Sequence, residues 1–161
     1  MNPASAKTSI NQIPALHKFT LTLALSTFDF GAGKKGKIDD LYAPKPFRYI
    51  AYDPFNRTQS ENSRSITEFY DDPTDIVTCA NVLNVIEDDH LGEVIAKLYS
   101  FTFETNKQVC FVSVYHNSRL AKNRKVGNHF QRNEPIQWYI PYLERYFRKV
   151  IRLGKFLCCE V

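Results

Sequence analysis

An apolar run that ends at an acid and leads into a glycine-rich segment constrains the fold of this chain more than any other feature. Residues 21–30 read LTLALSTFDF, and the following GAGKKG segment has the spacing GxGxxG through Gly31, Gly33 and Gly36. A buried strand leads to a helix N-terminus in this way. Asp53 then follows the second glycine at the spacing of roughly 20 residues that is typical of an acid binding ribose hydroxyls. This region therefore predicts a strand–turn–helix unit that binds a nucleotide-like cofactor.

Periodicity and turn residues divide the rest of the chain into alternating strands and helices. We expect strands over 48–52, 75–80 and 109–115, two closing strands within 149–161, a short strand over 65–70, helices over 37–42, 88–103 and 135–147, and loops over 56–64 and 117–132. Strands and helices that alternate at such spacing form parallel βαβ units.

The expected fold class is α/β: a three-layer, Rossmann-like, mostly parallel sheet with helices on both faces and an antiparallel C-terminal strand pair. Residues 1–19, polar and broken by Pro3 and Pro14, read as an N-terminal arm, and residues 20–161 as a single domain. Ligands of such folds bind outside the carboxyl ends of the strands. The functional residues should therefore follow each strand directly.

The composition of the chain indicates a soluble protein with one core, but it does not identify a binding partner. The 161 residues are 43% hydrophobic, which fills one core, and the net charge of +4 permits an anionic partner without requiring one. The four cysteines lie in strand-like runs with no CxxC spacing, so we expect buried, reduced thiols and no metal site. Lacking a signal-peptide pattern and any apolar run of roughly 20 residues, the chain reads as a soluble, cytoplasmic protein without a membrane partner.

Asp29, directly before the glycines, bears on which cofactor is bound. In dinucleotide sites the pyrophosphate lies at the helix N-terminus, where a neighbouring buried carboxylate repels it. S-adenosylmethionine has no phosphate, and its ammonium and sulfonium groups are favourable near a carboxylate. Asp29 thus favours S-adenosylmethionine over NAD.

Three motifs together resemble the successive motifs of class I S-adenosylmethionine-dependent methyltransferases. They are DFGAG at 29–33, YDPF at 52–55 and DIVTCANVLNVIED at 75–88, and the likeness extends over roughly residues 20–118. The combination is most similar to small bacterial or phage methyltransferases found near DNA-modification genes. The resemblance implies methyl transfer with S-adenosylmethionine as the cofactor.

The resemblance also implies roles for the residues of the first motif. Gly31, Ala32 and Gly33 would approach the methionine part of the cofactor, and Asp29 would bind its ammonium group directly or through water. The family often has its third glycine two residues after the second, one position earlier than Gly36. The resemblance therefore gives no firm role to Gly36.

The second and third motifs would complete the cofactor site. By the same resemblance, Asp53 binds the ribose, Pro54 and Phe55 flank the adenine, and Asn81 and Val82 line the pocket. The base-methylation motifs DPPY and NPPY and the Pro-Cys pair of cytosine-C5 enzymes do not occur in the sequence. The acceptor is consequently left open between a small molecule and a group derived from nucleic acid.

Three residues are candidates on the acceptor side. Asn84 stands where related enzymes often have Glu or His, and its amide is able to hydrogen-bond a substrate. Tyr115 and His116 follow a buried strand and would face the transferred methyl group as catalytic residues, with His116 a candidate general base. The alternative for His116 is an ordinary loop histidine, since methyl transfer from a sulfonium needs only alignment and proximity.

A basic segment follows these candidates. Its cations are a potential phosphate-binding surface for a nucleic acid, or alternatively a solvated loop. They are Arg119, Lys122, Arg124, Lys125, His129 and Arg132. Arg119, Arg124 and Arg132 are the substrate-binding candidates of this group.

Two other functions remain open. One is an accessory protein that binds a cofactor or a nucleic acid but has lost turnover; Asp29, Gly31, Gly33 and Asp53 argue against complete loss of the cofactor site. The other is an NAD-dependent oxidoreductase, which Asp29 and the lack of a second domain disfavour.

Overall fold

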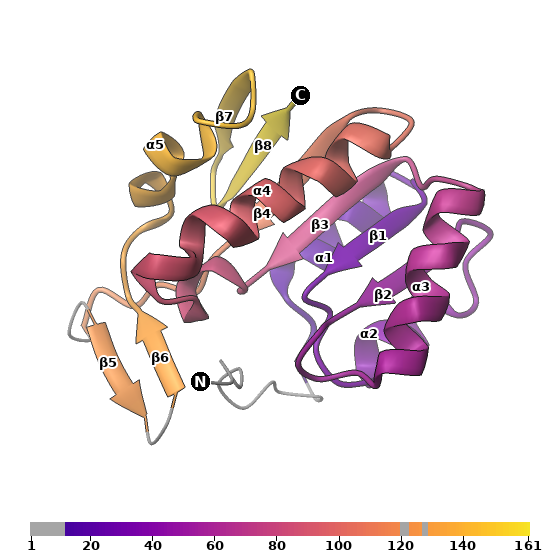
Figure 1. Cartoon of the computed structure of the whole chain (residues 1–161), viewed down its shortest axis with the longest axis horizontal. Coiled ribbons are helices and arrows are strands. Elements are labelled where there is room, and N and C mark those ends of the chain that lie inside the picture. The colour runs from indigo at the N-terminus through magenta and orange to yellow at the C-terminus, as the bar shows by residue number, and fades with distance from the viewer. Residues whose placement is uncertain (1–11, 120–122, 127–128) are drawn as a thin grey trace.

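The computed structural model describes residues 12–119, 123–126 and 129–161, with the backbone alone for 123–126 and 129 (Figure 1). In chain order the elements are α1 (Ala15–Thr22), β1 (Thr27–Phe30), α2 (Lys37–Tyr42), β2 (Tyr49–Tyr52), α3 (Gln59–Asp71), β3 (Ile76–Ala80), the 3₁₀ turn η1 (Leu83–Val85), α4 (Asp88–Glu104), β4 (Val109–Ser113), β5 (Asn123–Val126), β6 (His129–Arg132), the 3₁₀ turn η2 (Ile136–Tyr139), α5 (Ile140–Leu143), β7 (Lys149–Leu153) and β8 (Phe156–Glu160).

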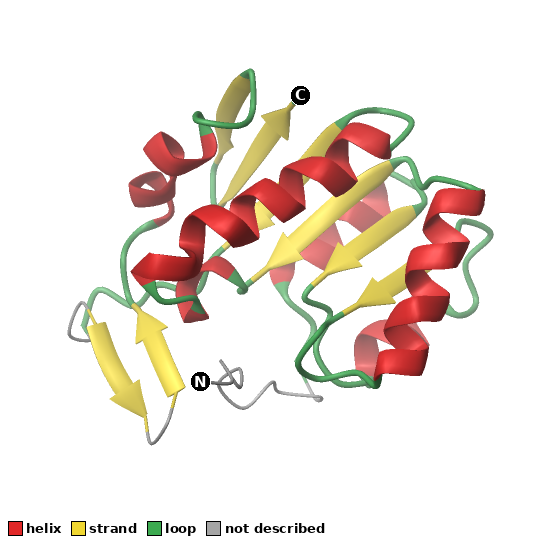
Figure 2. Cartoon of the chain, viewed as in Figure 1, coloured by secondary structure: helices red, strands yellow, loops and turns green. Residues whose placement is uncertain are grey.

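The main sheet has the strand order β2-β1-β3-β4-β8-β7 (Figure 2). The pairs β1–β2, β1–β3 and β3–β4 are parallel, whereas β8 runs antiparallel to both β4 and β7. The predicted α/β class, with a mostly parallel sheet and an antiparallel C-terminal strand pair, is confirmed. Because β1, β2, β3 and β4 are parallel, their carboxyl ends lie at the same end of the sheet.

Alternating side chains of the strands contact different helices. Phe28 and Val77 belong to a buried cluster with Phe69 of α3 and Phe101 of α4. The preceding residue in β3, Ile76, packs instead with Leu16 of α1 in a second cluster. Because successive side chains of a strand point to opposite faces, α1 covers the face opposite α3 and α4, as Figure 1 also shows.

The first strand is shorter than the sequence suggested. Leu21 and Thr22 end α1, and β1 begins only at Thr27, so the expectation of a strand over 21–30 was wrong at its start. Ala24, with a φ of 52°, lies in the turn between the two elements. Part of the segment assigned to an N-terminal arm is therefore a helix whose Leu16 is fully buried; residues 1–11 of that arm lie outside the described structure.

The segments 56–64 and 65–70, predicted as a loop and a short strand, mainly form one helix, α3. A capping box begins it: the Thr58 hydroxyl accepts from the Glu61 N–H at 3.2 Å, and the Glu61 carboxylate accepts from the Thr58 N–H at 2.8 Å. This pairing satisfies two N–H groups that a helix start otherwise leaves unbonded. Phe69, on the inner side of α3, anchors the polar helix in the core.

Two C-terminal expectations were also wrong in part. The segment 117–132 is not only a loop, because β5 and β6 pair as an antiparallel hairpin. The helix expected over 135–147 is reduced to η2 and the four-residue α5, whose first turn contains Pro141. Proline is tolerated at such a first turn but interrupts a longer helix.

The structure also bears on membrane-spanning helices and on the state of the cysteines. No helix in the described ranges is long and apolar enough to cross a membrane. Cys79, Cys110 and Cys159 are buried and Cys158 is partly buried, all four as free thiols. Burial raises the pKa of Cys79 and Cys110 well above the usual thiol range, so both remain protonated.

Replacing Phe28 with alanine tests the main core. The Phe28 ring lies 4.6 Å, centroid to centroid, from each of the Phe69 and Phe101 rings and is fully buried. We expect Phe28→Ala to lower the free energy of unfolding by about 3–5 kcal/mol, because it removes the ring that joins β1 to α3 and α4. Urea denaturation measures the change. Tyr70 is half-exposed, and its ring contacts those of Phe69 and Phe101. Tyr70→Ala should therefore cost clearly less, and equal losses would contradict this packing.

Candidate functional site

A cavity of about 830 Å³ opens at the carboxyl ends of the parallel strands. This volume lies within the range of about 300–1,000 Å³ that is usual for small-molecule sites. Ten of the residues singled out from the sequence line it: Asp29, Gly31, Ala32, Asp53, Pro54, Phe55, Asn81, Val82, Asn84 and Tyr115. The fold therefore brings the three sequence motifs together around one space.

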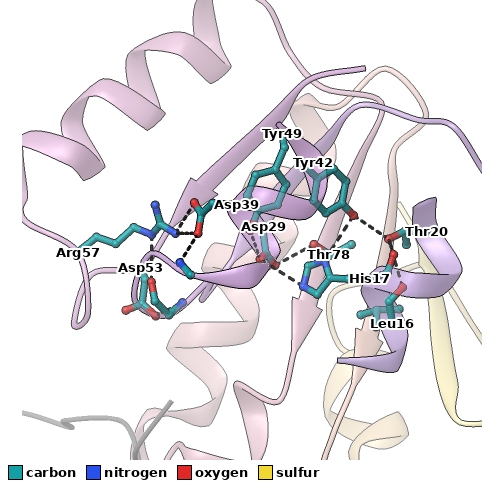
Figure 3. A network of polar contacts seen from close by, with 12 residues as sticks. Leu16, His17, Thr20, Asp29, Asp39, Tyr42, Tyr49, Asp53, Arg57 and Thr78 are labelled. Atoms are coloured by element: carbon teal, nitrogen blue, oxygen red, sulfur yellow. Dashed lines mark hydrogen bonds and ion pairs between the residues drawn. The ribbon is translucent and has the colours of Figure 1, made fainter. Parts of the chain in front are cut away.

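Asp29 is a buried carboxylate at the cavity wall, 1% exposed, and its bonds come from three neighbouring elements (Figure 3). The Tyr49 hydroxyl of β2 donates to Oδ2 at 2.7 Å and the Thr78 hydroxyl of β3 to Oδ1 at 2.9 Å. His17 Nε2 of α1 lies 3.3 Å from Oδ2. These contacts hold a negative charge at the cavity without direct exposure to bulk water.

The Tyr49 phenol is fixed as a donor to this carboxylate. Burial raises the pKa of Tyr49 well above its usual range, and the adjacent Asp29 charge raises it further. Tyr49 therefore keeps its proton at neutral pH. The hydroxyl then donates to Asp29 and does not compete with it as a second anion.

The glycine turn after β1 depends on two positive backbone angles. Gly31 has φ +82° and Gly33 has φ +73°, a region that residues with a Cβ rarely adopt. The N–H groups of Gly31 and Ala32 both donate to the Tyr52 carbonyl, at 2.8 and 3.1 Å. A Cβ on Gly31 would lie 2.3 Å from Cγ2 of Val82, so the loops after β1 and β3 touch at the glycine.

The Asp53 carboxylate joins this turn to the loop after β2 by hydrogen bonds. Its Oδ2 accepts from the Gly33 N–H at 2.9 Å and from the Asn56 amide at 3.1 Å. Its Oδ1 accepts from the N–H groups of Phe55 and Asn56 at 2.8 and 2.9 Å. A carboxylate has about four acceptor positions, and all are used here. Binding of a ribose by Asp53 thus requires the exchange of at least one of these donors.

Arg57 provides a second tie between the same two loops. Its Nε donates to the Gly33 carbonyl at 3.0 Å, and its guanidinium pairs with Asp39 of α2 at 2.9 and 3.1 Å (Figure 3). The Gly36 N–H donates to the same Asp39 carboxylate at 2.9 Å. Gly36 accordingly belongs to the start of α2 and does not line the cavity.

The chain turns sharply where it leaves β3. Asn81 has φ +59°, and its N–H donates to the Ser113 carbonyl of β4 at 2.8 Å. Asparagine tolerates this left-handed conformation better than most residues with a side chain. The turn brings Val82 over Gly31 and places Asn84, 2% exposed, in the cavity wall.

Some predicted site residues lie elsewhere. His116 and Arg119 are exposed and do not line the cavity, in contrast to the half-exposed Tyr115. Arg132, expected in an exposed basic loop, is 1% exposed: it pairs with Asp88, donates to the Leu83 carbonyl at 3.3 Å and lies over the Trp138 ring. Its guanidinium therefore joins β6 to η1 and α4.

The other basic candidates fall beyond what the structure describes. Lys122 lies outside the described residues, and so do the side chains of Arg124, Lys125 and His129. The backbone register of the hairpin places Arg124 opposite Gln131, and Gln131 lines the cavity. Residues opposite each other in an antiparallel pair share a face. Arg124 is thus placed on the hairpin face that includes a cavity residue.

Sequence reasoning missed two cavity residues with clear contacts. His17 was assigned to the arm, although Leu16, Phe19 and Thr20 have helical spacing after Pro14 and signal a helix there. Lys97 of α4 donates to the Tyr52 hydroxyl and lies 4.9 Å from the centre of its ring. Nothing in the local sequence marks that contact, because it joins elements 45 residues apart.

Comparison with known proteins leaves the site to be interpreted from its geometry. No protein-family model matches the sequence, and a search of curated proteins found no relative. Across the described ranges, no group of three or more His, Cys, Asp or Glu side chains is arranged to hold a metal ion.

Two glycine substitutions test the contact between the loops. Gly154→Ala introduces only backbone strain, because Gly154 has φ +62° with no atom within 4 Å of its Cβ position, and we expect a loss of about 1–2 kcal/mol in unfolding free energy. Gly31→Ala adds a clash with Val82 and should cost about 1–3 kcal/mol more. Urea denaturation of both variants gives the comparison. Equal losses would show that the loops do not pack as described.

Proposed function

We propose that this protein is an S-adenosylmethionine-dependent methyltransferase with a three-layer, Rossmann-like fold. The observation that carries the proposal is the single cavity wall formed by Asp29, the glycine turn, the loop after β2 and the loop after β3. In open α/β sheets, ligands bind outside the carboxyl ends of the strands. The position of the cavity agrees with that rule.

The Asp29 carboxylate fits the ammonium group of the cofactor. Three contacts, from His17, Tyr49 and Thr78, leave one of its roughly four acceptor positions open. A negative charge at the wall of this cavity attracts an ammonium and a sulfonium and repels a pyrophosphate. The same charge therefore supports this cofactor against NAD, the basis of the alternative oxidoreductase function.

The loops after β2 and β3 fit the adenosine part. Phe55 is 45% exposed and lines the cavity together with Pro54, so its ring is available to stack on adenine. Val82, in the loop after β3, supplies an apolar contact. Asp53 would reach the ribose by exchanging its bond from the Asn56 amide, since its three other donors are backbone N–H groups that hold the loops.

The bound cofactor would supply an electrophilic methyl group on its sulfonium. The chain's own residues would hold it with Asp29 and align the acceptor on the side of β3 and β4, where Tyr115 lines the cavity. Proximity and alignment account for most of what such a transfer needs. The acceptor is a small molecule or a group derived from nucleic acid.

Calorimetric titration of the purified chain with S-adenosylmethionine, S-adenosylhomocysteine and NAD tests the proposal. We expect micromolar binding of the first two ligands and none of NAD. Asp29→Asn should weaken the first two roughly ten- to hundredfold, because a hydrogen bond to a charged group contributes about 1.5–3 kcal/mol.

Asp75→Asn is the matched control for this loss. Asp75 is also a hydrogen-bonded carboxylate, which accepts from the N–H and the hydroxyl of Ser26 at 2.9 and 2.8 Å, but it does not line the cavity. Its substitution should leave the affinity unchanged. Binding of NAD alone would contradict the proposal. No measurable binding of any of the three ligands would also contradict it and would favour an accessory protein without turnover.

A further inference from the structure

Asn84 combines deep burial with an unused hydrogen-bonding group. The side chain is 2% exposed and lines the cavity, yet its amide oxygen has no hydrogen-bond partner among the described residues. Leaving a buried acceptor unpaired costs stability, and folded proteins seldom do so without a reason. Asn84 therefore differs from an ordinary buried asparagine.

Asn62 shows what an ordinary buried asparagine does in this fold. Its Oδ1 accepts from the Asp53 N–H at 3.0 Å, and its Nδ2 donates to the carbonyls of Asp53 and Arg57 at 2.9 and 3.3 Å. All of these bonds hold the loop after β2. The Asn84 amide oxygen has no such partner among the described residues, so it is available to a ligand.

The position of Asn84 separates it from the adenosine side of the cavity. Asp53 and Phe55 follow β2, at the edge of the sheet, whereas Asn84 follows β3 and Tyr115 follows the adjacent β4. The carbonyl of neighbouring Leu83 is bonded to Arg132 of β6, which brings the hairpin to the same side. Asn84 thus lies among the residues proposed to align the methyl acceptor.

We propose that Asn84 binds the methyl acceptor, and that the acceptor is an aromatic ring bearing an N–H or O–H group. The unpaired amide oxygen requires a hydrogen-bond donor. Tyr115, 45% exposed at the same side of the cavity, offers a ring face for stacking, and Val85 and Ile86 add apolar wall. This inference rests on the proposed methyltransferase function and names its substrate class.

The first test compares the stability of two leucine variants without ligand. Leucine has nearly the shape of asparagine and no polar group. Asn84→Leu removes an unpaired acceptor, so its melting temperature should equal or exceed that of the original chain. Asn62→Leu breaks paired bonds and should lower the melting temperature by several degrees. A comparable fall for Asn84→Leu would give Asn84 a structural role and overturn the inference.

The second test measures ligand binding by NMR titration of the chain saturated with S-adenosylhomocysteine. The probes are matched pairs: phenol and anisole, 2-aminopyridine and 2-dimethylaminopyridine, benzamide and N,N-dimethylbenzamide. We expect at least one donor to bind about tenfold more tightly than its methylated counterpart, and Asn84→Leu to abolish that difference. The affinity for S-adenosylhomocysteine itself should stay within about twofold.

The outcomes separate the two proposals. If S-adenosylhomocysteine does not bind the original chain, the methyltransferase function fails and this inference fails with it. If it binds, but no donor is preferred in any pair or the preference survives in Asn84→Leu, the assignment of Asn84 is wrong and the methyltransferase proposal stands.

Discussion

The buried carboxylate of Asp29 is the constraint on which the arrangement of this site depends. An ionised group in the interior is costly unless it is paired and hydrogen-bonded. Its partners His17, Thr78 and Tyr49 come from α1, β3 and β2, on either side of β1 in sequence and in space. The packing of α1 on the sheet and the pairing of β1 with β2 and β3 therefore bring hydrogen-bond partners to the Asp29 carboxylate, which also lines the cavity.

The loops around that charge hold one another in place. Gly31 allows Val82 to approach the turn after β1, while Asp53 and Arg57 bond to the two polar groups of the Gly33 backbone. Such contacts fix the cavity wall before any ligand arrives, which lowers the ordering cost of binding. Asn84 does not take part in these bonds: its amide oxygen has no partner among the described residues, and we propose that a substrate supplies one.

Local patterns predicted most of the sheet and ten of the residues that line the cavity, because both depend on apolar runs and on the residues that follow them. Contacts between segments that are distant in the chain could not be predicted from the sequence. Arg132 was predicted in an exposed basic loop as a substrate-binding candidate, but its burial beside Trp138 is decided by how the hairpin packs. The saturation of Asp53 by backbone N–H groups depends on turn geometry. The helix α3 was missed although Thr58 and Glu61 form a readable capping signal, since its polar composition resembled a loop.

We propose that the cavity holds S-adenosylmethionine through Asp29, and a crystal structure of the chain with S-adenosylhomocysteine would test this contact. We expect the ligand ammonium at hydrogen-bonding distance, about 3 Å, from the Asp29 carboxylate, with adenine against Phe55 and the sulfur facing the side of Asn84 and Tyr115. A ligand bound outside this cavity, or within it but with its ammonium away from Asp29, would contradict the account.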